Sequence, residues 1–281
     1  MAKPEHDFHL VNPSPLPIIA SFAAFTMFLG VVFLMHGAEA SGISLGYILT
    51  PLGTIGVLTV MYLWWKGVIY EAIHDKIHTS VVQHGLRLGM LLFILSEVMF
   101  FFVFFWSFFK SALDPVLVFD GLHIFESTIE PVIGVFPPEG VQTFDPWDLP
   151  FMNTLILLLS GTTVTWAHYA LLNDDRKGLV QGLAYSVALG VFFSFMQIVE
   201  YTHAPFGFRD GNYSSNFYMA TGFHGFHVFI GTLFLAVCLY RAMKGQFTKE
   251  HHLGFEFAAW YWHFVDVVWL FLFAFVYVWG E

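Results

Sequence analysis

The stretch MLLFILSEVMFFFVFFWSFF, residues 90–109, holds one ionisable side chain, Glu97, among apolar and aromatic residues. As a helix, roughly 20 such residues are long enough to cross the hydrocarbon core of a bilayer. Glu97 would then lie near the middle of the membrane, where a charged side chain costs about 2.5–3.5 kcal/mol on insertion scales. The stretch therefore predicts a transmembrane helix. Glu97 is either a functional carboxyl group or a protonated one that is hydrogen-bonded to a neighbouring helix.

The composition of the chain is that of an integral membrane protein. Of its 281 residues, 57% are hydrophobic and 11% are charged, whereas soluble domains carry about 25% charged residues. The net charge of −10 argues against nucleic acid as a partner. A single cysteine, Cys238, excludes an internal disulfide and a cysteine metal cluster. The first residues lack the features of a cleaved signal peptide, so we expect none.

Seven apolar stretches are long enough to span a bilayer, and they are too long and too uniformly apolar for barrel strands. The sequence therefore predicts an all-α membrane protein with seven transmembrane helices, forming a single polytopic domain over residues 1–281. The expected helices cover residues 16–35, 43–65, 87–109, 151–172, 180–203, 218–240 and 256–279.

The basic residues predict the orientation of the chain. Nine of the eleven fall on one side of the expected helices, and only Lys110 and Arg209 fall on the other. The nine are Lys3, Lys66, Lys76, Arg87, Arg176, Lys177, Arg241, Lys244 and Lys249. Because basic residues stay on the cytoplasmic side, the N-terminus is expected to be cytoplasmic or matrix-facing and the C-terminus to be outside.

The long outer connection, residues 110–150, is rich in acidic residues and prolines. The prolines indicate ordered turns rather than a separate domain. The acidic side chains form either a solvated face or a surface that guides a basic partner.

Ionisable side chains also occur within the later helices. They include Glu200, Glu256, His168, His224, His227, His263 and Asp266. His224 and His227 have the i, i+3 spacing of a metal-binding pair, but the other histidine pairs fall near the opposite membrane face. We favour neutral histidines that hydrogen-bond between helices. His263 and Asp266 share a helical face, as either a proton relay or a packing pair, and we favour packing.

Polar and aromatic side chains gather at the inner end of the second and third helices. Trp64 and Trp65 precede Lys66, and indoles anchor at the membrane interface. Glu71, His78 and Arg87 follow at the same level, and Arg241 and Lys244 end the sixth helix on that side. Basic pockets there suit anionic lipid head groups, and a solvated loop is the alternative.

Several motifs in order carry a resemblance to a known family. They are GLRLGMLLFILSEVMFFFVFFWSFF (85–109), PPEG followed by FDPW (137–147), NTLILLLSGTTVTWAH (153–168), FYMATGFHGFHVFIGTLFL (217–235) and GFEFAAWYWHFVDVVWLFLF (254–273), with HLVNPSPLPI and the WWK of residues 64–66 before them. Together they resemble subunit III of haem–copper cytochrome c oxidase nearly from end to end.

The resemblance implies a two-plus-five arrangement of the seven helices around a V-shaped cleft that holds phospholipids. It implies that the chain carries no redox centre and binds no metal. Haem and copper would reside in partner subunits, chiefly subunit I, on which this chain would pack beside other oxidase subunits. Cytochrome c would be the substrate of the complex. The expected role is to support proton uptake and to protect subunit I from inactivation during turnover.

The resemblance also assigns individual residues. Glu97 matches a buried carboxyl group of the cleft. The inner side of the cleft would be lined by Trp64, Trp65, Glu71, His78 and Arg87, and anionic lipid would be contacted by Arg241 and Lys244. Three features depart from the family pattern: Gly67 stands where an acidic residue is expected, Phe136 where a tryptophan is expected, and residues 114–136 form an unusually long segment.

The sequence therefore predicts a non-catalytic subunit of a proton-pumping respiratory oxidase, in a bacterial plasma membrane or a mitochondrial inner membrane. One competing hypothesis is an independent ion or proton transporter that uses Glu97, His263 and Asp266. It would need a continuous polar path, and the third helix offers only Ser96 and Glu97. The other competing hypothesis is a membrane di-iron enzyme that uses the histidines.

Overall fold

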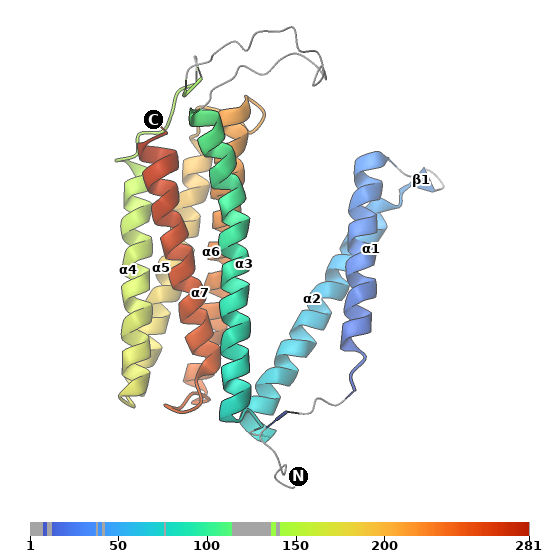
Figure 1. The fold of residues 1–281 in the computed structure, drawn as a ribbon, viewed down its shortest axis with the longest axis vertical. Helices are drawn as coiled ribbons and strands as arrows, with labels where there is room; N and C mark the ends of the chain where they lie inside the picture. Colours follow the sequence, from blue (N-terminus) through green and yellow to red (C-terminus); the bar gives the residue numbers. More distant parts are fainter. Residues whose placement is uncertain are drawn as a thin grey trace. The chain divides into compact units, whose positions relative to one another are not determined.

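Seven long apolar helices make up most of the chain in the computed structural model (Figure 1). The structure describes residues 8–9, 13–37, 39–40, 43–75, 77–113, 136–138 and 141–280. Within these ranges, all seven helices are long and apolar enough to cross a membrane. The prediction of an all-α membrane protein with seven spanning helices is confirmed. Lys3, Lys76 and most of the acidic outer connection lie outside the described residues.

The helices follow one another with short connections except before α4. The helices are α1 (Leu16–His36), α2 (Gly46–Tyr70), α3 (Ser80–Leu113), α4 (Leu149–Leu172), α5 (Arg176–Thr202), α6 (Asn212–Met243) and α7 (Leu253–Leu272). A π-helical segment continues α2 as η1 (Glu71–Asp75), and another continues α7 as η2 (Phe273–Val278). Two short antiparallel strands, β1 (Glu39–Ala40) and β2 (Ile43–Ser44), connect α1 to α2.

Several helices extend beyond the apolar stretches that predict them. The third was expected over residues 87–109 and covers Ser80–Leu113. The fifth was expected to begin at residue 180 and begins at Arg176. There Asp175 caps the helix, because its Oδ1 accepts a hydrogen bond of 2.9 Å from the backbone N–H of Gly178. Hydropathy detects only the segment in hydrocarbon, whereas the helix continues into the polar interface.

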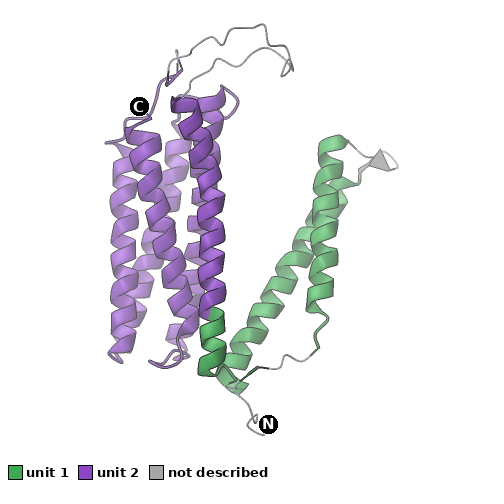
Figure 2. Ribbon diagram, in the orientation of Figure 1, with its two compact units in different colours: residues 1–86 green, residues 87–281 purple. Residues whose placement is uncertain are grey.

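The chain divides into two compact units, residues 1–86 and residues 87–281 (Figure 2). The first contains α1, α2 and the first turns of α3, and the second contains the rest of α3 with α4 to α7. This grouping has the two-plus-five division of helices that the resemblance implies. The single-domain assignment stays a prediction.

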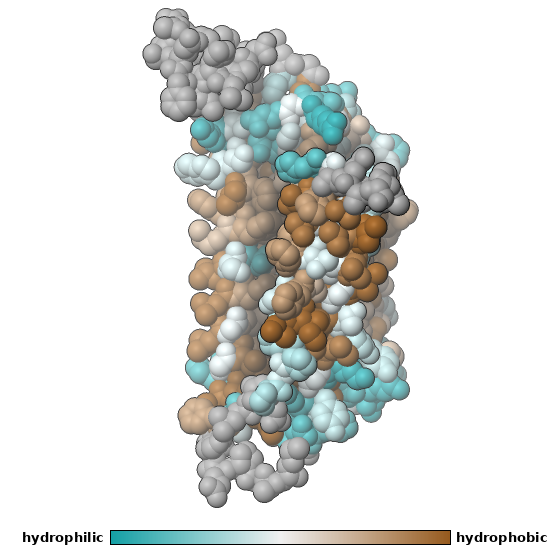
Figure 3. All heavy atoms as spheres, turned by 90° about the vertical axis from the view of Figure 1, so that its right-hand side faces the viewer, coloured by the Kyte–Doolittle hydropathy of each residue, from teal (hydrophilic) through white to brown (hydrophobic). Residues whose placement is uncertain are grey.

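In the first unit, α1 and α2 pack through glycines. A Cβ atom at Gly53 would lie 2.2 Å from the backbone nitrogen of Met27, and one at Gly30 would lie 2.4 Å from that of Thr50. The two backbones therefore approach too closely for any side chain at these positions, which is how small residues join membrane helices. The outer faces remain apolar: Phe22, for example, is 68% exposed. Figure 3 shows a broad hydrophobic band across the middle of one face, as expected of a lipid-facing surface.

In the second unit, α7 supplies more buried hydrophobic side chains than any other helix. Trp262 and Trp269 are fully buried. The indole N–H of Trp262 donates to Ser160 Oγ over 2.9 Å, and that of Trp269 donates to Thr154 Oγ1 over the same distance. Both hydroxyl groups belong to α4, so these bonds fix the rotation of α7 against α4. Buried indoles are thereby satisfied without water.

Candidate functional site

Glu97 of α3 lies within hydrogen-bonding distance of His227 of α6. Glu97 Oε2 is 2.8 Å from His227 Nε2, and the side chains are 20% and 10% exposed. The other ring nitrogen, Nδ1, is 2.6 Å from the carbonyl oxygen of Phe223, one turn earlier on α6. The carboxyl group that has no partner in its own helix therefore has one in a neighbouring helix.

These two contacts restrict the hydrogen-bonding forms of the pair to two. A carbonyl oxygen only accepts, so Nδ1 of His227 carries a hydrogen and donates it to Phe223. In a neutral ring, Nε2 is then an acceptor, and Glu97 has to be the protonated donor. If the ring is instead doubly protonated, Nε2–H donates to a Glu97 carboxylate. In both forms one proton lies between Glu97 and His227, and the pair as a whole is uncharged.

Aromatic rings surround this pair. The ring centroids of Phe101 and Tyr261 lie 4.9 Å and 6.3 Å from that of His227, and Phe100 lies 6.0 Å away. Such surroundings strengthen a hydrogen bond because they exclude water. Between Met90 and Phe109, α3 has no further ionisable group above or below Glu97.

Arg87, at the inner end of α3, forms a bidentate ion pair with Glu256 of α7. Arg87 Nε donates to Glu256 Oε1 over 2.9 Å, and Nη2 donates to Oε2 over 2.8 Å. The Arg87 side chain is 38% exposed. Arg87 was expected to contact lipid. In the structure, the guanidinium of Arg87 donates its hydrogen bonds to Glu256. Sequence reasoning missed this partner, although Glu256 falls on the same predicted side of the membrane.

The two basic residues at the end of α6 both lie over aromatic rings. The guanidinium of Arg241 is 4.5 Å from the centre of the Phe247 ring, and its Nε donates to Gln246 Oε1 over 3.2 Å. Lys244 lies 5.6 Å from the centre of the Tyr240 ring and is exposed. Of the two, Lys244 is the more available to an anionic ligand.

Trp64 and Trp65 line a groove between α1 and α2, within the first unit. It has a volume of about 500 Å³, and its lining consists of Ala20, Ala24, Val57, Val60, Met61, Trp64, Trp65 and Val68. Trp64 and Trp65 are 44% and 60% exposed. Glu71, in η1, and His78, beside His9 with ring centroids 6.3 Å apart, do not line this groove.

The other three histidines predicted to lie at buried polar positions contact neighbouring segments of the second unit. His224 is fully buried, and its Nε2 donates to the carbonyl oxygen of Val265 over 3.1 Å. His263 Nε2 lies 3.2 Å from Thr165 Oγ1, and His263 Nδ1 lies 3.6 Å from Asp266 Oδ2. The ring of His168 packs against those of His252 and Phe255.

His224 and His227 do not converge on a common ligand. His224 contacts α7, whereas His227 contacts α3. Within the described part of the chain, no three His, Cys, Asp or Glu side chains gather closely enough to hold a metal ion.

Comparison with known proteins completes the assignment. The sequence model of the family described as cytochrome c oxidase subunit III matches residues 6–281. The chain belongs to this family. Among its relatives, a protein of Rickettsia prowazekii named "Probable cytochrome c oxidase subunit 3" is 55% identical over 98% of this chain and 96% of its own length. "Cytochrome c oxidase subunit 3" of Prototheca wickerhamii is 54% identical over 98% of both chains. The protein of that name in Arabidopsis thaliana is 50% identical over 98% of this chain and 97% of its own length.

Membership in the cytochrome c oxidase subunit III family confirms the resemblance predicted from the motifs. The chain is a subunit of the oxidase complex of the respiratory chain, and its partners include other subunits of that complex. It is a multi-pass membrane protein. Neither an independent transporter nor a di-iron enzyme accounts for a match over nearly the whole chain.

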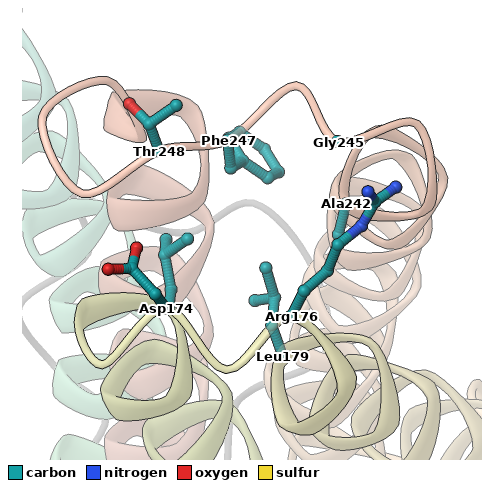
Figure 4. Close-up of a pocket in the computed structure, with 8 residues that line it drawn as sticks. Asp174, Arg176, Leu179, Ala242, Gly245, Phe247 and Thr248 are labelled. Atoms are coloured by element: carbon teal, nitrogen blue, oxygen red, sulfur yellow. The ribbon is translucent and has the colours of Figure 1, made fainter.

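This subunit III chain also has a small pocket that the sequence did not indicate (Figure 4). It measures about 180 Å³ and lies between the α4–α5 turn and the loop that follows α6. Two polar contacts join these segments: Lys249 Nζ is 2.5 Å from Asp174 Oδ2, and Arg176 Nη2 donates to the carbonyl oxygen of Met243 over 2.7 Å. The charged side chains around the pocket thus connect two loops, which is a structural role.

Proposed function

We propose that this subunit sustains the oxidase without taking part in electron transfer. It packs on subunit I, which holds the haem and copper centres. The subunit III chain also binds phospholipid in the groove between α1 and α2. The observation that carries the lipid part of the proposal is the groove between α1 and α2. Membership in the oxidase family supports the packing part.

The α1–α2 groove has the properties of an acyl-chain site. Its walls are apolar, and Ala20 and Ala24 leave room that larger side chains would fill. Each methylene group of an acyl chain in such a site is stabilised by about 0.8 kcal/mol relative to water. Most of that stabilisation is also present when the acyl chain lies in bulk lipid. Trp64 and Trp65 line the groove and directly precede Lys66 in the sequence. An indole pair beside a base suits a lipid whose phosphate lies at the interface.

The orientation follows from the basic residues of the second unit. Arg87 lies early in α3, Arg176 is the first residue of α5, and Arg241 and Lys244 lie at the end of α6. Alternating helix directions bring these positions to one end of the unit. We propose that this end is cytoplasmic or matrix-facing, as the positive-inside rule requires, in a bacterial plasma membrane or a mitochondrial inner membrane.

The same end supports the proposed role in proton uptake. Glu256, His168 and His252 lie close together there, beside Arg87. Titratable groups at the inner surface collect protons from solution and raise their local supply to an entry point nearby. The subunit would thus assist uptake from its surface, and the proton between Glu97 and His227 would stay in place.

The lipid proposal is tested by replacing Trp64 and Trp65 together with leucine in the intact oxidase. We expect the amount of phospholipid that co-purifies with each complex to fall by about one molecule, measured by mass spectrometry of extracted lipid. Leucine keeps the surface apolar but removes the interfacial anchor.

Trp147→Leu is the matched control, because Trp147 is 64% exposed and precedes α4 in the second unit, where it does not line the groove. Its lipid content should equal that of the unaltered complex. An unchanged lipid content in the double variant would contradict the assignment of the groove.

A further inference from the structure

The helices α4 and α7 lie side by side in the second unit (Figure 1), and each carries polar side chains near its middle. Four of these side chains, Thr162, Thr165, His263 and Asp266, are called here the α4–α7 polar patch. Thr162 lies near the middle of α4, and Asp266 lies near the middle of the span Leu253–Val278. The patch therefore sits far from both membrane surfaces.

The patch uses only part of its hydrogen-bonding capacity. Thr165 Oγ1 donates its hydrogen to the carbonyl oxygen of Gly161 over 3.1 Å, so it accepts from His263 Nε2, which is 3.2 Å away. His263 Nδ1 is 3.6 Å from Asp266 Oδ2, within ion-pair range but too far for a hydrogen bond. Asp266 Oδ1 is buried and has no hydrogen-bond partner among the described residues.

Burial and exposure divide the patch in a particular way. The Asp266 side chain is only 8% exposed, because it lies directly over Gly161, where an added Cβ would be 2.3 Å from Oδ2. The His263 side chain is 45% exposed, and Thr162, one turn before Thr165 on α4, is exposed as well. A buried carboxyl group with a free oxygen thus underlies an imidazole that faces outward.

Lipid is a poor occupant for this surface. Acyl chains offer neither donors nor acceptors, and head groups lie about 15 Å away, at the edge of a hydrocarbon core of about 30 Å. Ionisable side chains at this depth almost always face protein or a water-filled cavity. An occupant that satisfies the patch has to carry polar side chains at mid-depth, which is a property of a protein helix.

We propose that the α4–α7 polar patch is the docking face for a transmembrane helix of another oxidase subunit. That helix brings a hydroxyl or amide side chain to His263 and Asp266. Interhelical hydrogen bonds in membranes contribute about 0.6 kcal/mol on average, so the patch sets the position of the helix, and packing supplies most of the affinity. The inference rests on the proposed packing of this subunit within the oxidase.

The first experiment maps the face by photo-crosslinking in the assembled oxidase. A benzophenone side chain is placed at position 162 of α4, or at position 237 of α6, where Val237 is 50% exposed. We expect an adduct with another oxidase subunit at position 162, in higher yield than at position 237. Equal yields, an adduct within this chain, or adducts with lipid alone would overturn the proposal. Co-purification of the chain with the oxidase is scored in the same samples, because its loss would refute the proposed packing instead.

The second experiment separates hydrogen bonding from packing at His263. His263→Gln keeps a side chain that donates and accepts, whereas His263→Leu removes both abilities at a similar size. After purification in a harsher detergent, we expect the glutamine variant to retain this subunit as the unaltered complex does and the leucine variant to retain several-fold less. Equal retention of the two variants would overturn the proposed hydrogen-bonded docking.

Discussion

Replacing His227 with leucine is expected to destabilise the second unit by about 1–3 kcal/mol, the usual cost of leaving a buried hydrogen-bonding group without its partner. Glu97 Oε2 loses the contact of 2.8 Å to Nε2. The thermal midpoint of the detergent-solubilised oxidase, followed by the release of this subunit, measures the loss. His203→Leu is the control, because His203 is exposed at the end of α5.

Removing both partners should restore most of this stability. In the variant that combines Glu97→Leu with His227→Leu, no polar group is left unpaired, and replacing a buried pair by apolar residues is often neutral or stabilising. A double variant that is less stable than His227→Leu alone would contradict the pairing of these two side chains.

The pair also predicts how the oxidase responds to loss of the carboxyl group. Glu97→Gln keeps a hydrogen-bond donor toward Nε2 but cannot release a proton. Because the proton between Glu97 and His227 is proposed to stay in place, turnover and the number of protons moved per electron should not change. A several-fold fall in either quantity would assign direct proton transfer to Glu97.

Truncating Trp262 to alanine is expected to have the largest effect on folding, about 3–5 kcal/mol. Its indole is fully buried and donates to Ser160 of α4. It also fills the space over Gly190 of α5 and Gly231 of α6, where an added Cβ would meet the ring at 2.8 Å. One side chain of α7 therefore holds three other helices, and its loss leaves a cavity that these glycines cannot fill.

Two further variants make this prediction specific. Trp262→Phe keeps most of the ring and loses the hydrogen bond, so it should cost about 1 kcal/mol. Trp147→Ala removes an indole that is 64% exposed and should have little effect. The yield and thermal midpoint of the purified oxidase measure all three. A Trp262→Ala variant as stable as Trp147→Ala would refute the central position of Trp262.

The helices could be predicted from sequence because a bilayer imposes one simple rule. A chain in hydrocarbon has to satisfy its own backbone, so every long apolar stretch becomes a helix. The helix ends were less accurate. Arg176 and Lys177 are polar, so hydropathy placed the start of α5 too late, although Asp175 before them is a good helix cap.

The partners of the polar residues could not be predicted in the same way. A hydrogen bond from Glu97 to a neighbouring helix was one of two alternatives, but nothing in its sequence spacing selects His227, 130 residues later. Arg87 and Glu256 are 169 residues apart, and their pairing depends on which helices are adjacent. The sequence does indicate that the two residues lie at the same depth in the membrane, because both lie at the inner ends of predicted helices. Asp266 could likewise have been placed beside Gly161, the glycine within the polar run of α4.

The central claim is that this subunit sustains the oxidase while holding none of its redox centres. The most direct measurement compares the oxidase purified with and without this chain, scoring haem and copper content and the decay of activity during continuous turnover. We expect unchanged haem and copper per subunit I, a similar initial rate, and an activity that decays several-fold faster without the chain. Loss of haem or copper with the chain, or identical decay of the two preparations, would contradict the central claim.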